Sequence, residues 1–212
     1  MNNNKIDLLN DVAAYYSGKL AEHGETARGA DWNSEEGQIL RFEQLCKIAQ
    51  DAEGGFSVND LGCGYGALLD YLTSRHSISS YLGIDVSENM VRAAQLCHKD
   101  APEVRFITAS EPDQMADYGI ASGIFNVRLD RGDTEWLCHL QAMLDTLDRT
   151  SRRGFAFNCL TSYSDEDKKR DYLYYADPCL LFDLCKCRYS RHVALLHDYG
   201  LYEFTILVRR LR

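Results

Sequence analysis

Long apolar runs are missing from this chain. Its 212 residues are 45% hydrophobic, yet none of its apolar runs approaches the length of about 20 residues that a membrane-spanning helix needs. A signal segment, in which charged residues precede an apolar run, is also missing from the start. These absences predict a protein that has no membrane partner and acts in the cytoplasm.

Positive charge is in short supply. The chain has 23 Lys and Arg against 32 Asp and Glu, a net charge of -9 at pH 7. Affinity for DNA or RNA depends on cations that neutralise phosphates, so this balance predicts no nucleic-acid partner. Basic residues do cluster at 168–170 and 209–210, which we interpret as solvated faces or strand ends.

The sequence also lacks the closely spaced pairs of cysteines that are typical of zinc sites. The eight cysteines include no Cys-x-x-Cys pair and are scattered along the chain, which predicts reduced thiols that act as small hydrophobes. Their one cluster is Cys179, Cys185 and Cys187, followed by His192 and His197. Zinc is the alternative interpretation of this cluster, but without paired ligands we expect no metal site.

What the chain does have is an alternation of strands and helices. Apolar spacing predicts strands at 56–61, 80–85, 104–108, 120–125 and 154–159, and helices at 5–22, 36–53, 66–75, 88–99, 133–147 and 178–187. A helical turn is expected at 111–117, a capping pair at Asn33 and Glu36, and a closing hairpin at 193–197 and 203–208. The alternation predicts a single α/β domain with a parallel sheet.

A glycine-rich turn lies between the first strand and its helix, in the segment Val58 to Leu69. Asp60, Gly62, Gly64 and Gly66 form the pattern Asp-x-Gly-x-Gly-x-Gly. Glycines let the backbone approach a ligand, and a helix that starts there points its free N–H groups at that ligand. A dinucleotide fingerprint reads Gly-x-Gly-x-x-Gly instead, so the spacing argues against a nicotinamide dehydrogenase.

In this motif the chain resembles the class I S-adenosylmethionine-dependent methyltransferases, and the resemblance extends over about 56–160. The resemblance implies a three-layer αβα, Rossmann-like fold with a mostly parallel seven-stranded sheet of order 3-2-1-4-5-7-6, ending in a β-hairpin. It also implies S-adenosyl-L-methionine as cofactor and S-adenosyl-L-homocysteine as product. We expect one domain, 1–212, divided into an N-terminal helical lid (1–55), a cofactor-binding core (56–160), an insertion near the substrate cleft (161–190) and the hairpin (191–212).

The expected cofactor site follows the carboxyl ends of the strands, where ligands of open α/β sheets bind. By the resemblance, Asp85 accepts hydrogen bonds from the ribose, while Met90 could equally be plain core. Ser110 and Glu111 stand where the family often has an acidic or polar residue near the adenine. The expected cofactor-binding residues are Asp60, Gly62, Cys63, Gly64, Gly66, Asp85, Val86, Met90, Ser110, Glu111 and Phe125, with Tyr16 and Arg28 from the N-terminal segment.

The acceptor side is expected beyond the fourth strand, in the N-terminal segment and in the insertion. Candidates for substrate binding are Tyr15, Trp32, Asn126, Tyr163 and Tyr175, and candidates for catalysis are Asn126, Arg128, His197 and Tyr163. Arg128 has an alternative role in an ion pair with Asp130 or Asp133, and His197 in structure alone. The residues after the fourth strand, 123–128, also lack an Asn-Pro-Pro-Tyr or Asp-Pro-Pro-Tyr run. In the resembling family such a run marks enzymes that methylate amino groups of bases or glutamine amides.

The resulting hypothesis is in-line transfer of a methyl group from S-adenosylmethionine to a small-molecule acceptor, whose nucleophile (O, N, S or C) is open. Positioning and desolvation are the main tasks of the protein in such a transfer. Two alternatives stay open: a protein or peptide methyltransferase, and a non-catalytic regulatory protein that binds S-adenosylmethionine.

Overall fold

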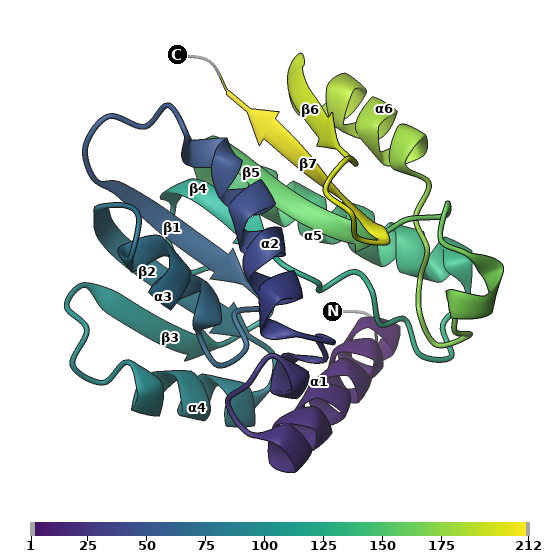
Figure 1. Cartoon of the computed structure of the whole chain (residues 1–212), viewed down its shortest axis with the longest axis horizontal. Helices are drawn as coiled ribbons and strands as arrows, with labels where there is room; N and C mark the ends of the chain where they lie inside the picture. The colour runs from purple at the N-terminus through teal and green to yellow at the C-terminus, as the bar shows by residue number, and fades with distance from the viewer. Residues whose placement is uncertain (1–2, 211–212) are drawn as a thin grey trace.

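The structure is a computed structural model that describes residues 3–210 (Figure 1). The strands are β1 (Phe56–Leu61), β2 (Ile78–Asp85), β3 (Val104–Thr108), β4 (Ala116–Ala121), β5 (Ser151–Leu160), β6 (His192–Leu196) and β7 (Glu203–Arg209). The helices are α1 (Asn3–His23), α2 (Glu35–Cys46), α3 (Ala67–Thr73), α4 (Glu88–Cys97), α5 (Asp133–Thr150) and α6 (Pro178–Arg188), with short 3-10 helices η1 (Arg28–Ala30), η2 (Lys47–Ala49) and η3 (Glu166–Lys168).

The strands form one seven-stranded sheet in the order β3-β2-β1-β4-β5-β7-β6. Strands β1 to β5 pair in parallel, whereas β7 runs antiparallel to both β5 and β6. The predicted sheet order and the closing hairpin are therefore confirmed. The strand order reverses between β1 and β4, and this is the point where open α/β sheets leave a crevice for a ligand.

Helices cover both faces of the sheet, giving three layers (Figure 1). One buried cluster joins side chains of α1, α5 and α6 to one face, and a second joins α2, α3 and α4 to the other. In β5, Phe155 and Phe157 belong to the first cluster and Ala156 to the second, as the alternation of side chains along a strand requires. Both faces of the central strands are thus buried, as expected for parallel strands that helices cover on both sides.

The fourth strand lies earlier in the chain than the sequence predicts. It covers Ala116–Ala121 rather than 120–125, and the expected helical turn at 111–117 is wrong. Tyr118 pairs with Val58 of β1, and the Asp117 carboxylate accepts hydrogen bonds from the N–H and hydroxyl of Ser57. Gly123 has a left-handed φ of 77° and turns the apolar residues that follow it out of the sheet.

The capping prediction at the start of α2 is wrong by one residue. Ser34, not Asn33, has the extended cap conformation, and its hydroxyl accepts a hydrogen bond from the N–H of Gly37 at 3.1 Å. The helix also ends at Cys46 instead of continuing towards Gly54. Ser87 caps α4 and Asp177 caps α6, since the side chain of each accepts hydrogen bonding from the first turn of its own helix.

No helix among residues 3–210 is long and apolar enough to cross a membrane. Within the same range, no three His, Cys, Asp or Glu side chains gather in a metal-binding group. The segment 161–190 packs along the loop after β4, to which it is joined by a bridge between Leu173 and Val127.

Candidate functional site

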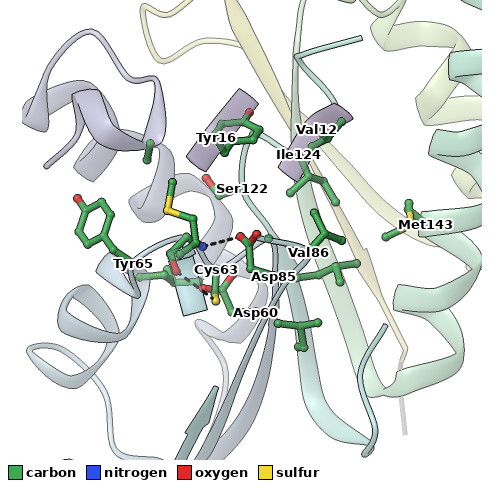
Figure 2. Close-up of a pocket in the computed structure, with 18 of the residues that line it drawn as sticks. Val12, Tyr16, Asp60, Cys63, Tyr65, Asp85, Val86, Ser122, Ile124 and Met143 are labelled. Atoms are coloured by element: carbon green, nitrogen blue, oxygen red, sulfur yellow. Dashed lines mark hydrogen bonds between the residues drawn. The ribbon is translucent and has the colours of Figure 1, made fainter. Parts of the chain in front are cut away.

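A cavity opens at the carboxyl ends of β1, β2 and β4, where the strand order reverses (Figure 2). Its empty space, which includes the open mouth, is about 980 Å³. The N-terminal segment, the glycine turn, the ends of β2, β3 and β4, and one face of α5 all line it. The lining residues are Leu9, Val12, Tyr16, Ala30, Trp32, Gln38, Phe42, Asp60, Leu61, Gly62, Cys63, Gly64, Tyr65, Ala67, Leu68, Ile84, Asp85, Val86, Met90, Ala109, Ser110, Ser122, Gly123, Ile124, Trp136, His139 and Met143.

The glycine turn forms the floor of this cavity. The N–H groups of Gly62 and Cys63 both donate to the carbonyl of Ile84, which ties the turn to β2. Gly62 has a φ of 78°, and a Cβ on it would lie 2.1 Å from Cγ2 of Ile124. Only glycine fits this position, because a side chain would be both strained and in collision with the loop after β4.

Asp85 holds two parts of the site together. One carboxylate oxygen accepts from the N–H of Gly64 at 3.0 Å (Figure 2), and the other from the N–H of Ser87 at 2.8 Å. Burial raises the pKa of Asp85, and these two N–H groups oppose that rise. A carboxylate has about four acceptor positions, so each oxygen can still accept a further hydrogen bond.

Asp60 is the second carboxylate in the cavity and is almost fully buried. Its Oδ2 accepts a hydrogen bond from the Tyr81 hydroxyl. Burial raises the pKa of Asp60 to about 7; the Tyr81 hydroxyl opposes this shift and the nearby charge of Asp85 adds to it. Asp60 therefore changes charge near neutral pH, unlike an ordinary surface carboxylate.

The N-terminal segment closes one side of the cavity. Leu9, Val12 and Tyr16 face inward from α1, and Trp32 follows η1. The Ser17 hydroxyl lies 2.9 Å from that of Ser87, which fastens α1 to the start of α4. Burial raises the pKa of the Tyr16 hydroxyl, so this side chain is a neutral donor in the wall.

The structure brings ten of the residues expected from the sequence into this one cavity and leaves ten outside it. Those inside are Asp60, Gly62, Cys63, Gly64, Asp85, Val86, Met90, Ser110, Tyr16 and Trp32. Those outside are Gly66, Glu111, Phe125, Arg28, Tyr15, Asn126, Arg128, Tyr163, Tyr175 and His197.

The outside residues expected near the cofactor have other contacts. Gly66 is the cap residue at the start of α3, and Glu111 forms an ion pair with Arg149. Phe125 is fully buried against Phe157 under the loop after β4. Arg28 is exposed to solvent.

Two outside residues hold the loop after β4 in place. The Asn126 side-chain oxygen accepts from the N–H of Leu160 at 3.1 Å. Arg128 donates to the carbonyls of Leu173 and Arg131 and lies 3.3 Å from a carboxylate oxygen of Asp133. The ion pair of Arg128 with Asp133, the alternative considered from the sequence, is thus present.

The remaining outside residues are tyrosines and a histidine on other surfaces. The exposed rings of Tyr163 and His197 have centroids 6.0 Å apart and contact each other. The Tyr175 hydroxyl accepts from the N–H of Arg170, and the Tyr15 hydroxyl donates to Asp31 at 2.7 Å. None of the described residues in 161–190 lines the cavity, so the insertion lies beside the site rather than in it.

Several lining residues were missed from the sequence, above all Gln38, Tyr65, Ser122, Ile124 and His139. Helical periodicity could have indicated His139, because it follows Trp136 by three positions and precedes Met143 by four. The same spacing joins Gln38 to Phe42. Ser122 and Ile124 were misassigned with the strand that in fact ends at Ala121.

One polar atom in the cavity wall has no partner. The Ser122 hydroxyl is buried and makes no hydrogen bond within residues 3–210. A buried polar group without a partner is costly, and its place beside Gly123 fits a polar ligand that supplies the missing bond. The open glycine turn and the two carboxylates fit the same kind of ligand.

Comparisons with known proteins agree with this geometry. The family described as "Methyltransferase domain" matches residues 59–150. The chain is 66% identical over 160 residues to "Putative methyltransferase Rv1506c" of Mycobacterium tuberculosis, a match that covers 76% of this chain and 96% of that protein.

Solved structures share the fold at much lower identity. The DhpI-SAM-HEP complex is 14% identical with a TM-score of 0.67, covering 96% of this chain and 98% of that one. The N-methyltransferase NodS from Bradyrhizobium japonicum WM9, in complex with S-adenosyl-L-homocysteine, is 12% identical with a TM-score of 0.66, covering 94% of this chain and 98% of that one. Given the relative that shares most of its length, this chain belongs to the class I S-adenosylmethionine-dependent methyltransferases.

Proposed function

We propose that this methyltransferase acts on a small-molecule acceptor that carries no carboxylate or phosphate, and that both reactants meet in the cavity at the ends of β1, β2 and β4. One observation carries the proposal. The acidic side chains in the cavity wall are Asp60 and Asp85, and among the described residues no Lys or Arg lines it. S-adenosylmethionine would already bring one carboxylate into this cavity, so a further anion on the acceptor would find no Lys or Arg there to offset its loss of solvation.

The residues of the wall suit the parts of the cofactor in the order in which they line the cavity. Asp85 would accept hydrogen bonds from the ribose hydroxyls, and Val86 and Ser110, at the ends of β2 and β3, would flank the adenine. The glycine turn and Asp60 would hold the amino-acid end, which would bring the sulfur near Gly123 after β4. S-adenosylmethionine supplies an electrophilic methyl group on a sulfonium, and the two carboxylates suit its positive charges.

The acceptor would then lie against the side of the cavity that α1 and Trp32 close. The N-terminal segment contributes seven of the lining residues, from Leu9 to Phe42, and we assign acceptor recognition to it rather than to the insertion. This assignment proposes a division of labour within one domain, in which 56–160 holds the donor and 1–55 the acceptor.

Turnover with fractionated cell extract tests the acceptor class. Release of S-adenosylhomocysteine is measured with the small-molecule fraction, split by an anion exchanger, and with the protein fraction. We expect turnover with small molecules that the exchanger does not retain, and none with the Asp85→Ala variant. Turnover with the protein fraction alone would instead establish a protein methyltransferase, and tight cofactor binding without turnover a regulatory protein.

Cofactor affinity is expected to fall in mild acid because of Asp60. Its pKa of about 7 means that protonation sets in as the pH drops below neutral. The ammonium of the bound amino-acid end favours the ionised carboxylate, so binding to the protonated form costs a deprotonation. Between pH 7 and pH 5.5 the Kd measured by calorimetry should rise roughly 15-fold, the change in the ionised fraction.

The matched control is Asp60→Asn, which cannot titrate. We expect its Kd for the cofactor to be higher than that of wild type at pH 7 and to change little between pH 7 and pH 5.5. Tyr81→Phe should move the midpoint to higher pH, because the Tyr81 hydroxyl opposes the rise in the pKa of Asp60. Equal slopes for wild type and Asp60→Asn would show that another group causes the pH dependence.

A further inference from the structure

Trp32 packs directly on the end of β4. A Cβ built on Gly123 would lie 2.4 Å and 2.5 Å from atoms Cη2 and Cζ2 of the indole. The ring therefore occupies the space that a side chain at position 123 would need. Both residues line the cavity, so the indole forms its wall next to the end of β4.

Arg41 of α2 holds the face of this indole. Its guanidinium carbon lies 4.1 Å from the centroid of the Trp32 ring, within the range of a cation–π contact. The same guanidinium donates twice to Glu203 at the start of β7, from Nε to Oε2 at 2.9 Å and from Nη2 to Oε1 at 2.7 Å. The Arg41 and Glu203 side chains are 10% and 1% exposed, so this ion pair belongs to the interior.

The contacts close into a ring. Glu203 Oε2 also accepts from the side-chain nitrogen of Asn158 at 2.6 Å, and the Asn158 side-chain oxygen accepts from the N–H of Gly123 at 2.8 Å. We call these five residues, Trp32, Arg41, Gly123, Asn158 and Glu203, the Trp32 network. Through Arg41 of α2, Glu203 of β7 and Asn158 of β5, it fixes the position of the indole relative to the loop after β4.

We propose that Trp32 is a specificity-determining residue that limits the size of the group carried on the cofactor sulfur, and that Arg41, Asn158 and Glu203 are positioning residues that hold its indole in place. The proposal rests on the proposed function, in which the sulfur lies near Gly123. The physical reason is shape: a flat ring clamped by a planar guanidinium cannot swing aside for a larger group. The network also lies outside the matched family segment, except for Gly123.

The test needs no knowledge of the acceptor. The probe is the sulfonium analogue of S-adenosylmethionine in which benzyl replaces methyl, and the readout is the ratio of its Kd to that of S-adenosylmethionine by calorimetry. For wild type we expect the analogue to bind far more weakly. Trp32→Ala should lower the ratio at least about tenfold, as expected for relief of a steric mismatch in a pocket.

Two variants separate the wall from what holds it. Arg41→Lys keeps a charge for Glu203 but loses the planar stack on the indole, and Glu203→Gln weakens the hold on Arg41; both should lower the ratio with Trp32 intact.

Two further variants are controls. Tyr65→Ala truncates another aromatic side chain of the cavity and should change both Kd values by the same factor. Glu135→Gln, in an exposed ion pair with Arg131, should change neither. Thermal unfolding confirms that each variant is folded, and Arg41→Lys carries the test if Glu203→Gln is not.

Each result decides a different point. If wild type fails to bind S-adenosylmethionine, the proposed site itself is wrong. If it binds both ligands equally, or if Trp32→Ala leaves the ratio unchanged, Trp32 does not limit the sulfur substituent. If Trp32→Ala lowers the ratio and Arg41→Lys does not, the wall is correct and the positioning role of the network is wrong.

Discussion

Asp85→Ala is expected to weaken S-adenosylmethionine binding by roughly two to four orders of magnitude. In the proposed orientation both ribose hydroxyls donate to this carboxylate, and hydrogen bonds to a charged group contribute about 1.5–3 kcal/mol each. Their joint loss, about 3–6 kcal/mol, corresponds to a factor of roughly 10²–10⁴ in Kd. The variant also leaves the N–H groups of Gly64 and Ser87 without their acceptor, which loosens the glycine turn. Isothermal calorimetry with S-adenosylhomocysteine measures the effect.

Two variants make the result specific. Asp85→Asn keeps one acceptor oxygen and should lose much less affinity than Asp85→Ala. Asp117→Ala likewise removes a carboxylate with two hydrogen bonds, those from the N–H and hydroxyl of Ser57, but from β4 outside the cavity. Its affinity for the cofactor should equal that of wild type. If Asp85→Ala bound as well as Asp117→Ala, the ribose would have to lie elsewhere.

Arg41→Met is expected to cost about 3–5 kcal/mol of folding stability, the usual cost of leaving one partner of a buried ion pair alone. The carboxylate of Glu203 would then be buried with only Asn158 as a hydrogen-bond donor in the network. Urea unfolding, with the slope compared between variants, gives the free energy of unfolding. The double variant Arg41→Met with Glu203→Met removes both charges and should be more stable than Arg41→Met alone.

The exposed pair of Glu88 and Arg92 on α4 is the matched control. It joins residues four positions apart with side chains more than half exposed, so Arg92→Met should change stability little. A cost for Arg41→Met no larger than that for Arg92→Met would mean that the buried pair contributes nothing to the fold. A double variant as unstable as the sum of its singles would mean that the two charges do not interact.

The glycine turn, the acid at the end of β2 and the closing hairpin could be predicted from the sequence, because their signals are local. The glycine turn, the acid that ends β2 and the closing hairpin each occupy a few consecutive residues with a fixed spacing. Sequence order then gave the sheet order through the family resemblance. Asp85 and Gly64 accordingly meet in the structure at 3.0 Å, although 21 positions separate them.

The N-terminal wall of the cavity could not be predicted from the sequence, because long-range packing decides it. Arg41 and Glu203 read as surface charges in their own segments, and only the pairing of α2 with β7 buries them together. The apolar stretch at 120–125 reads as a strand, but pairing with β1 selects Ala116–Ala121 instead. Tyr163 and Tyr175 of the insertion were expected near the substrate because they are aromatic, yet the insertion follows a path beside the cavity and neither residue lines it.

The Arg41–Glu203 pair has a consequence for the order in which the site is assembled. The two residues stand 162 positions apart, and Glu203 opens the last strand of the sheet. During synthesis Arg41 leaves the ribosome well before Glu203, so the guanidinium has no carboxylate to meet until β7 is made. The glycine turn and Asp85 both precede β7 in the chain. Translation thus supplies the glycine turn and Asp85 before the ion pair that holds the Trp32 indole can form.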